Sequence, residues 1–427
     1  MKFDREQLVK VIDFWQKSLE RDLLYERKVL DEIDLKGKEV IDLVGPRRSG
    51  KSSVMELIIK RLGLSISDFL YINFEDPFFI ENNDPEIIEE IVSVFREYYG
   101  ANLKYLFLDE VQEIAGWEKT IRKFRDGEKL KIFLTGSSSK LLSKELSTLL
   151  TGRHKTYSIL PLSFREFLDF RKLKVNNKKD LIVKSVKIKK QFLEYLKIGG
   201  FPEPVLNDDE QLLKNYFYDI LQKDIMMRYR VREREALEKI AIYALSNLGK
   251  PISVESIKKA HNISYVMAAK YVAYLQEAFL IFSLTQFSFS LKKQAKAYKK
   301  IYCIDTGLAN AVSFRFSDDK GRYLENVVYL ELIRRNKKLY YYKTKNNLEV
   351  DFAIFENQKV VELTQVVWSL ADEQTARREK NSLVAAMEES GLKKGMIFTY
   401  DEQSTIKTDA GIIEVKPVWL WLLEDNN

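Results

Sequence analysis

The sequence is short of cysteine, of histidine and of long apolar runs. Its 427 residues include one cysteine, Cys303, and two histidines, His154 and His261. One cysteine excludes an internal disulfide, and these three residues are too few for a Cys/His zinc site. No stretch reaches the roughly 18 apolar residues of a membrane helix, and the N-terminal segment lacks the apolar core of a secretory signal. We therefore expect a soluble protein of the reducing cytoplasm, without structural zinc and without membrane contact.

The sequence does contain enough apolar residues for several folded domains. Hydrophobic residues make up 45% of the chain and aromatic residues 12%, which excludes disorder as the main state. The net charge of +7 is unevenly distributed: fourteen basic and five acidic residues lie between Arg228 and Lys300, and nine basic and one acidic between Arg171 and Lys190. Such segments suit a polyanion such as DNA, and the alternative is a solvated face.

The apolar pattern divides the chain into five parts. Helical spacing predicts N-terminal helices within 1–35. In 36–160, short apolar strands alternate with helical segments, which predicts a parallel sheet with helical crossovers. The strands are expected at 40–44, 70–74, 105–108 and 131–135. The pattern then predicts a small helical lid at 161–231, the helix, turn, helix and hairpin order of a winged helix at 232–312, and a separate mixed α/β domain at 313–427.

The strongest motif is a phosphate-binding loop. Residues 45–52 fit the pattern GxxxxGK[ST] between a predicted strand and a predicted helix. The loop's backbone N–H groups face the phosphates, Lys51 reaches the β and γ oxygens, and the Ser52 hydroxyl ligates Mg²⁺. We therefore predict ATP and Mg²⁺ as cofactors. The predicted nucleotide-binding residues are Gly45, Pro46, Arg47, Arg48, Ser49, Gly50, Lys51, Ser52 and Ser53.

Two acids follow the predicted strand at 105–108. Asp109 is expected at the carboxyl edge of the sheet, where it shares Mg²⁺ with Ser52, and Glu110 is expected beside it, where it polarises the attacking water. The alternative is a solvated strand end or a helix cap. After a phosphate-binding loop we favour the first interpretation, with Lys51 and Glu110 as catalytic residues.

Three further positions carry weaker signals. The hydroxyl residues from Thr135 to Ser139 either sense the γ-phosphate or cap a helix that begins near Lys140. Arg153 is predicted as a catalytic arginine finger donated to a neighbouring subunit, and its alternative is a surface ion pair. Asn73 is a candidate for orienting Glu110.

These motifs, in this order, resemble the prokaryotic AAA+-related P-loop ATPases (archaeal type) that carry a C-terminal domain of unknown function. The resemblance spans nearly the whole chain and implies an ATP-binding core, a winged helix and a restriction-endonuclease-like end of the PD-(D/E)XK nuclease fold. The residues that carry it lie at 45–52, 71–77, 108–118, 134–139, 161–167, 199–204, 324–326 and 349–352.

The basic segment supplies candidates for DNA contact. Ser264 to Glu277 is the expected recognition helix, with Tyr265 and Lys270 facing outward. The expected wing carries lysines that would meet phosphates without reading sequence: Lys292, Lys293, Lys296, Lys299 and Lys300. The alternative is a winged helix that packs on neighbouring domains.

The end domain departs from the nuclease pattern that it resembles. Glu325, Asp351 and Glu362 would be its carboxylates, but the position two residues after Glu362, where active members have lysine, is Thr364. Lys343 is a weak substitute. The triplet Glu414-Val415-Lys416 lies too far along the chain to complete the site. We therefore expect a catalytically silent binding module.

These observations support one leading function and two alternatives. The leading prediction is a Mg²⁺-dependent ATPase that binds or remodels DNA through its basic C-terminal half. The first alternative is an ATP-gated regulatory or defence switch that acts through protein partners, and the second is an ATP-dependent nuclease. A homo-oligomer or a protein partner is compatible with each.

Overall fold

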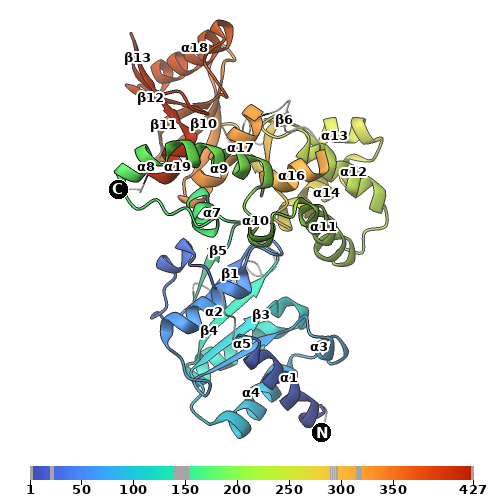
Figure 1. The fold of residues 1–427 in the computed structure, drawn as a ribbon. Helices are drawn as coiled ribbons and strands as arrows, with labels where there is room; N and C mark the ends of the chain where they lie inside the picture. The colour runs from blue at the N-terminus through green and yellow to red at the C-terminus, as the bar shows by residue number, and fades with distance from the viewer. Residues whose placement is uncertain are drawn as a thin grey trace. The chain divides into compact units, whose positions relative to one another are not determined.

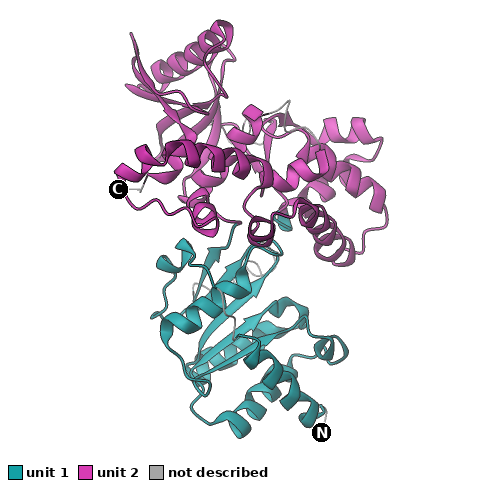
Figure 2. Cartoon of the chain, viewed as in Figure 1, with its two compact units in different colours: residues 1–160, 277–279 teal, residues 161–276, 280–427 magenta. Residues whose placement is uncertain are grey.

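The computed structural model describes residues 3–19, 24–138, 153–288, 290, 292, 294, 297–313 and 320–424. The chain forms two compact units, which Figure 2 shows in different colours. Unit 1 comprises residues 1–160 and 277–279, and unit 2 comprises residues 161–276 and 280–427. Each unit is described by itself below.

Unit 1 contains a parallel sheet (Figure 1). Its strands are β1 (Val40–Val44), β2 (Phe69–Asn73), β3 (Tyr105–Asp109), β4 (Lys131–Gly136) and β5 (His154–Ser158), in the order β2-β3-β4-β1-β5. All pairings are parallel. The predicted parallel sheet and its four apolar strands are confirmed. The edge strand β5 was not predicted, because its sequence, HKTYS, has no apolar run.

Helices surround this sheet. They are α1 (Arg5–Lys17), the 3-10 helix η1 (Lys28–Asp31), α2 (Lys51–Leu62), α3 (Pro77–Glu81), α4 (Glu86–Tyr99), the 3-10 helix η2 (Val111–Glu113), α5 (Trp117–Lys123) and the π-helix η3 (Phe124–Glu128). Val54 and Ile58 of α2 pack with Ile41, Phe107 and Phe133 of the sheet in one buried cluster. This packing fixes the start of α2, and with it the end of β1, at the carboxyl edge of the sheet.

Unit 2 begins with helices. They are α7 (Phe164–Phe170), α8 (Lys178–Val183), α9 (Ser185–Ile198), α10 (Pro202–Asn207), α11 (Glu210–Asp219) and the π-helix η4 (Ile220–Met227). A Cβ on Gly200 would lie 2.4 Å from the carbonyl oxygen of Leu162, so only glycine allows this approach. The Gly200 N–H donates to the buried Asp305 carboxylate (2.6 Å), which joins this part to a later segment of the unit.

The middle of unit 2 combines helices with a small antiparallel sheet. Its elements are α12 (Arg234–Leu245), β6 (Pro251–Ile252), α13 (Val254–His261), α14 (Tyr265–Glu277), β7 (Ile281–Leu284), β8 (Lys299–Cys303) and α16 (Thr306–Ser313). The strand order is β6-β8-β7, with antiparallel pairing throughout. Two helices are thus followed by a hairpin, in the predicted order.

The end of unit 2 is a mixed sheet with helices. Its elements are α17 (Lys320–Arg334), β9 (Leu339–Lys343), β10 (Glu349–Glu356), β11 (Lys359–Val366), α18 (Glu373–Ser390), β12 (Lys394–Thr399), β13 (Ser404–Thr408), β14 (Gly411–Pro417) and α19 (Val418–Leu423). The strand order is β13-β14-β12-β11-β10-β9. Leu383 and Met387 of α18 pack on Ala353, Leu363 and Ile397 of this sheet in a buried cluster.

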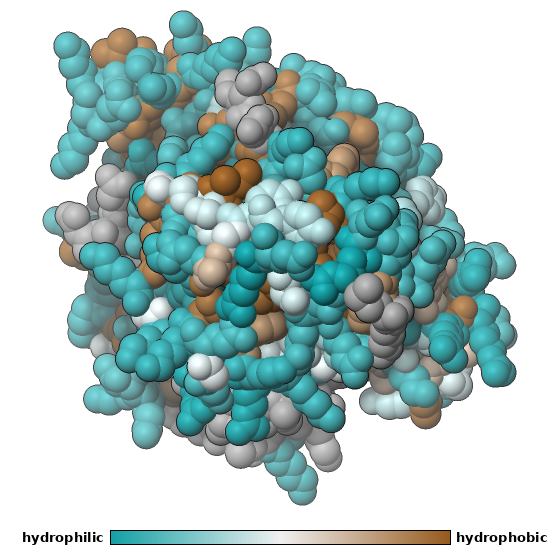
Figure 3. All heavy atoms as spheres, turned by 90° about the horizontal axis from the view of Figure 1, so that it is seen from below, coloured by the Kyte–Doolittle hydropathy of each residue, from teal (hydrophilic) through white to brown (hydrophobic). Residues whose placement is uncertain are grey.

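Among the described residues, no helix is both long and apolar enough to cross a lipid bilayer. The face drawn in Figure 3 is mostly hydrophilic, with smaller hydrophobic areas between the polar side chains.

Candidate nucleotide-binding site

The loop between β1 and α2 adopts a backbone conformation that depends on glycine at two positions. Gly50 has φ +95° and directly precedes α2, a conformation that glycine adopts without strain. A Cβ on Gly45 would lie 2.2 Å from the carbonyl oxygen of Ile159, so this position also requires glycine. The loop therefore turns tightly into the N-terminus of α2, where unpaired backbone N–H groups favour an anion.

Lys51, the first residue of α2, is buried under this loop. Its Nζ lies 3.3 Å from the carbonyl oxygens of Gly45 and Pro46. The same Nζ lies 3.1 Å from Oε1 of Glu110. Lys51 thus joins the loop after β1 to the acid after β3, although the two are far apart in the sequence.

Asp109, at the end of β3, is completely buried among hydroxyl groups. The Tyr71 hydroxyl donates to its Oδ2 (2.8 Å), the Thr135 hydroxyl donates to its Oδ1, and the Ser52 side chain also hydrogen-bonds to it. Burial and the neighbouring Glu110 charge raise the pKa of Asp109 above 3.8, against the effect of these hydrogen bonds. Because Ser52 and Asp109 offer adjacent hard oxygen ligands, the pair fits Mg²⁺, which takes few protein ligands and keeps several waters.

Glu110 has a strained backbone and a stabilised charge. Its φ is +52°, which is uncommon for a residue with a Cβ, and its N–H donates to the Thr135 hydroxyl (2.8 Å). Burial alone would raise the pKa of Glu110, but the charges of Lys51 and Arg47, together with hydrogen bonds from Gln112 and Lys51, lower it below 4.5. The carboxylate is therefore ionised at neutral pH and able to accept a proton.

The weaker sequence predictions have mixed outcomes. Thr135 does not cap a helix: its hydroxyl bonds to Asp109 and to the Glu110 N–H. Asn73 Nδ2 lies 3.4 Å from Oδ2 of Asp109, so the structure brings it to Asp109 and not to Glu110. Ser139 and the helix expected near Lys140 lie outside the described residues. Arg153 pairs with Asp126 (3.4 Å) on the surface, as its alternative interpretation expected, and its role towards a neighbouring subunit stays a prediction.

Sequence reasoning missed two residues that support this site. The buried Arg27 donates to the carbonyl oxygens of Ser49 (2.9 Å) and Leu160 (2.7 Å), which braces the phosphate-binding loop. Gln112 donates from Nε2 to Oε2 of Glu110 (2.5 Å). No local pattern marks Arg27, because its partners are backbone atoms 22 and 133 residues away. Gln112 lies within the acidic motif, and its proximity to Glu110 was the only available signal.

An acid–imidazole pair joins β1 to β5, with the acid buried. His154 Nδ1 is 2.8 Å from Oδ2 of Asp42, and Asp42 lies in the middle of β1. The hydrogen bond to Asp42 raises the pKa of His154 above 6.5. Burial, followed by the charge of Lys239, lowers the pKa of His261 below 6.5. The two histidines of this chain therefore titrate on opposite sides of the ordinary value.

We expect proton NMR of the untagged protein to resolve the two histidine ring signals, one titrating above pH 6.5 and one below. Asp42→Asn should move the His154 midpoint downward and leave His261 unchanged. Since the folded pKa of His154 is raised, its stabilising contribution is complete below pH 6.5 and is lost as pH rises through the folded pKa. A His154 signal that titrates below pH 6.5 would contradict the ion pair.

A second group of buried charges lies in unit 2, centred on Lys300. Its Nζ lies 2.7 Å from Asp351 Oδ1, 3.0 Å from Glu349 Oε1 and 3.1 Å from Glu325 Oε1. The expectation that Lys300 faces solvent with the wing lysines is wrong, because these carboxylates attract it inward. Lys292 and Lys299 are exposed as predicted, and Lys293 and Lys296 lie outside the described residues.

The expected grouping of Glu362 with Asp351 is also wrong. The Asp351 N–H donates to Oε1 of Gln365 (3.1 Å), so Gln365 is the side chain of β11 that lies beside Asp351. Side chains alternate between the faces of a strand, which places Glu362 on the face opposite Gln365. Lys343 lies 3.7 Å from Glu349; it does not occupy the centre of the group, where the Lys300 ammonium lies.

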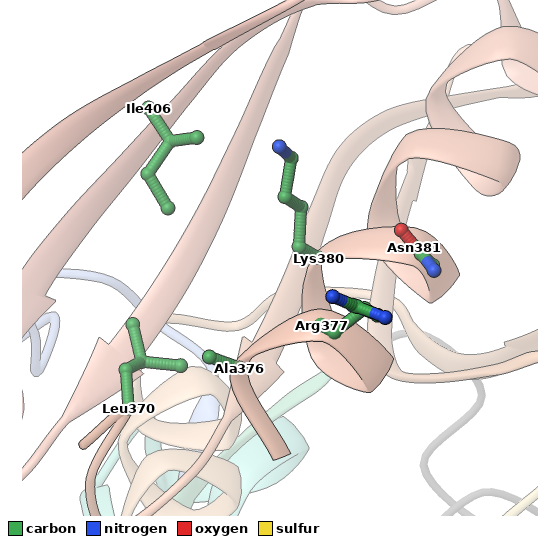
Figure 4. A pocket seen from close by; sticks show the side chains of 6 residues that line it. All are labelled: Leu370, Ala376, Arg377, Lys380, Asn381 and Ile406. Carbon is green, nitrogen blue, oxygen red and sulfur yellow. The ribbon is translucent and has the colours of Figure 1, made fainter. Parts of the chain in front are cut away.

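A pocket of about 450 Å³ also lies in unit 2, between α18 and β13 (Figure 4). Two cationic side chains, one amide and one alanine of α18 line it, together with two aliphatic residues from outside this helix. The lining residues are Leu370, Ala376, Arg377, Lys380, Asn381 and Ile406. None of the predicted site residues lines this pocket.

Comparison with known proteins gives three family matches. Residues 37–168, which include the phosphate-binding loop and both acids, match an AAA domain. Residues 189–319 match a domain of unknown function, DUF8612, and residues 320–421 match another, DUF4143. The sheet and these matches make residues 37–168 an AAA+-related P-loop domain of the α/β class.

Curated relatives match most of the chain. The uncharacterized protein MJ1544 of Methanocaldococcus jannaschii is 36% identical over 439 residues, which cover 95% of this chain and 96% of MJ1544. An uncharacterized protein of Haemophilus influenzae is 29% identical over 332 residues, which cover 75% of this chain and 80% of the Haemophilus protein. Among solved structures, Cdc6p from Pyrobaculum aerophilum has a TM-score of 0.27 at 11% identity, with 73% of this chain and 94% of Cdc6p covered; a TM-score of this size says nothing about what this chain binds.

Proposed function

This chain belongs to the same family as MJ1544 and carries an AAA domain, and from that premise we propose that it binds ATP with Mg²⁺ and hydrolyses it. One observation carries the proposal. Lys51, Ser52, Asp109 and Glu110 come from two distant segments, and their side chains contact one another at one edge of the sheet. A chance GxxxxGK[ST] match would not bring a buried acid pair to its lysine and serine.

Each of these residues has a defined role in the proposed reaction. The backbone of residues 45–53 and Lys51 bind the phosphates, and Ser52 and Asp109 hold Mg²⁺, which supplies charge neutralisation at the β and γ oxygens when bound. Glu110 accepts a proton from the water that attacks the γ-phosphorus, and ADP leaves with the electrons of the broken P–O bond. Arg153 contributes to a neighbouring subunit's site if the protein assembles.

We propose that unit 2 contacts DNA through α14 and the hairpin of β7 and β8, as a winged helix. Tyr265 and Lys270 of α14 are exposed, and so are Lys292 and Lys299 near the hairpin. The three lysines suit phosphate contacts, which position a protein on DNA without reading the base sequence. The excess of basic residues between Arg228 and Lys300 supports the same partner.

We propose further that the nuclease-like end is a binding module that does not cut DNA. A metal-dependent nuclease needs carboxylates that are free to hold a cation. Here the ammonium of Lys300 lies between Glu325 and Asp351, and the side chain of β11 beside Asp351 is an uncharged amide, Gln365. A competing positive charge and an amide in place of a further carboxylate at this position both disfavour Mg²⁺.

Duplex DNA should bind to the full chain with an affinity that falls steeply with salt. Lys270→Glu should weaken binding about tenfold and lower the salt slope by about 1, whereas Lys10→Glu, an exposed lysine of α1, should not. Fluorescence anisotropy at several salt concentrations measures both. Equal binding by the two variants would contradict the DNA surface.

The same DNA distinguishes the leading proposal from its alternatives. ATP turnover that rises with duplex or branched DNA supports coupling between the ATPase and DNA, whereas turnover indifferent to any nucleic acid supports a switch acting through protein partners. Supercoiled plasmid incubated with Mg²⁺ or Mn²⁺ should stay intact. Cuts that Asp351→Ala abolishes would contradict the silent end domain.

A further inference from the structure

Gln112 holds the second oxygen of the Glu110 carboxylate. It lies in η2, two residues beyond Glu110, and its Nε2 donates to Oε2 at 2.5 Å. The other carboxylate oxygen, Oε1, is 3.1 Å from Nζ of Lys51. Both oxygens of the proposed base are thus held, one by a cation and one by an amide.

ATP binding would affect the two partners of Glu110, Lys51 and Gln112, differently. Lys51 is the residue that the γ-phosphate attracts in the proposed reaction, and its ammonium already divides its contacts among Glu110, Gly45 and Pro46. When Lys51 turns to phosphate oxygens, its hold on Oε1 weakens. Gln112 has no charge to exchange with the nucleotide, so its contact with Oε2 persists.

The strained backbone of Glu110 makes such a partner necessary. With φ at +52°, the residue leaves the strand direction and projects its side chain from a tight turn. Its N–H is occupied by Thr135, which fixes the backbone but not the carboxylate. A carboxylate held by one departing cation alone would rotate about its side-chain bonds, and a misplacement of about 1 Å costs on the order of 10²-fold in rate.

Within the described ranges of the chain, the hydrogen bond to Glu110 is the one that the Gln112 side chain makes. Its Oε1 is buried and has no hydrogen-bond partner there. Because an unpaired buried acceptor costs free energy, the amide donor is held towards Glu110 at that cost.

We propose that Gln112 is a positioning residue for Glu110, which keeps the carboxylate oriented towards the attacking water while Lys51 binds the phosphates. This inference rests on the proposed ATPase function. It also has an electrostatic consequence: the amide donor stabilises the anionic form of Glu110, and a carboxylate in its place would destabilise that form.

The test compares Gln112→Ala, Gln112→Glu and a control, Gln276→Ala, which removes a partly buried glutamine that bonds to Ser283 in unit 2. Steady-state hydrolysis and MgATP affinity are measured separately for each protein. We expect Gln112→Ala to lower kcat about 10- to 100-fold and to leave the dissociation constant within about twofold. Gln112→Glu should also lower kcat, because a second carboxylate repels the Glu110 carboxylate that the amide donor holds. Gln276→Ala should resemble the wild type.

Two results would overturn the inference alone: hydrolysis by the wild type with an unchanged kcat in Gln112→Ala, or a loss in Gln112→Ala that appears only in MgATP affinity. A wild-type protein that binds MgATP but does not hydrolyse it would contradict the proposed function, and this inference with it.

Discussion

Replacing Glu110 with glutamine is expected to lower ATP turnover by about 10² to 10⁴-fold, because an amide cannot accept the proton of the attacking water. The substitution preserves the shape of the side chain. It also removes a negative charge next to Lys51 (3.1 Å), which frees the ammonium for the phosphates. MgATP affinity should therefore stay equal or increase, and the variant should accumulate bound ATP. Single-turnover and steady-state assays separate the two effects.

Glu113→Gln is the matched control for this prediction. Glu113 ends the short helix η2 that follows Glu110, and it is exposed. Glu113→Gln therefore removes one negative charge close to Glu110 without removing the contact with Lys51. Its turnover should equal that of the wild type. If Glu110→Gln also turned over at the wild-type rate, another residue would have to be the base.

Replacing Lys300 with methionine is expected to destabilise unit 2 by about 3 to 5 kcal/mol, because it leaves buried carboxylates without their cation. Methionine keeps the length of the side chain, so the loss of charge dominates. Lys299→Met, at the exposed neighbouring position of β8, should unfold like the wild type. Urea unfolding of the full chain, followed by circular dichroism, measures the difference between the two variants.

The effect of Lys300→Met should depend on pH with a defined sign. Burial and the Asp351 charge already raise the pKa of Glu325 to about 7, and without the ammonium the pKa should rise further. Protonation then relieves the repulsion, so the variant should lose less stability at pH 5.5 than at pH 8. Equal stability of the Lys300 and Lys299 variants at pH 8 would contradict the buried ion group.

Much of the nucleotide-binding site could be predicted because its signals are local. A glycine-rich loop between a strand and a helix, and two acids after another strand, are visible in short windows, and parallel strands bring their carboxyl ends to one edge. Thr135 could be predicted as part of the site because it lies in the apolar strand that became β4, between β1 and β3. Its partners, however, are set by the register of β3 on β4, which no local window contains.

The remaining contacts depend on residues far apart in the sequence. Lys300 was expected to face solvent because its neighbours Lys296 and Lys299 form a basic run, whereas carboxylates 25 and 51 residues later draw it inward. Counting residues back from the turn between β10 and β11 would place Glu362 on the same face as Asp351. A register shift between Ile354 and Phe355 changes the pairing, so Glu362 lies on the opposite face. The edge strand β5 was missed because its polar sequence does not indicate a strand. Its pairing with β1 holds it in the sheet.

The most direct test of the account is a titration of MgATP into the wild-type protein and into Lys51→Ala, with the bound nucleotide counted per chain. The account predicts one site per chain in the wild type and its loss in the variant, because the Lys51 ammonium contacts the phosphates directly. Lys60→Ala, an exposed lysine later in α2, should bind like the wild type. Equal MgATP binding by the wild type and Lys51→Ala, or none by the wild type, would contradict the site.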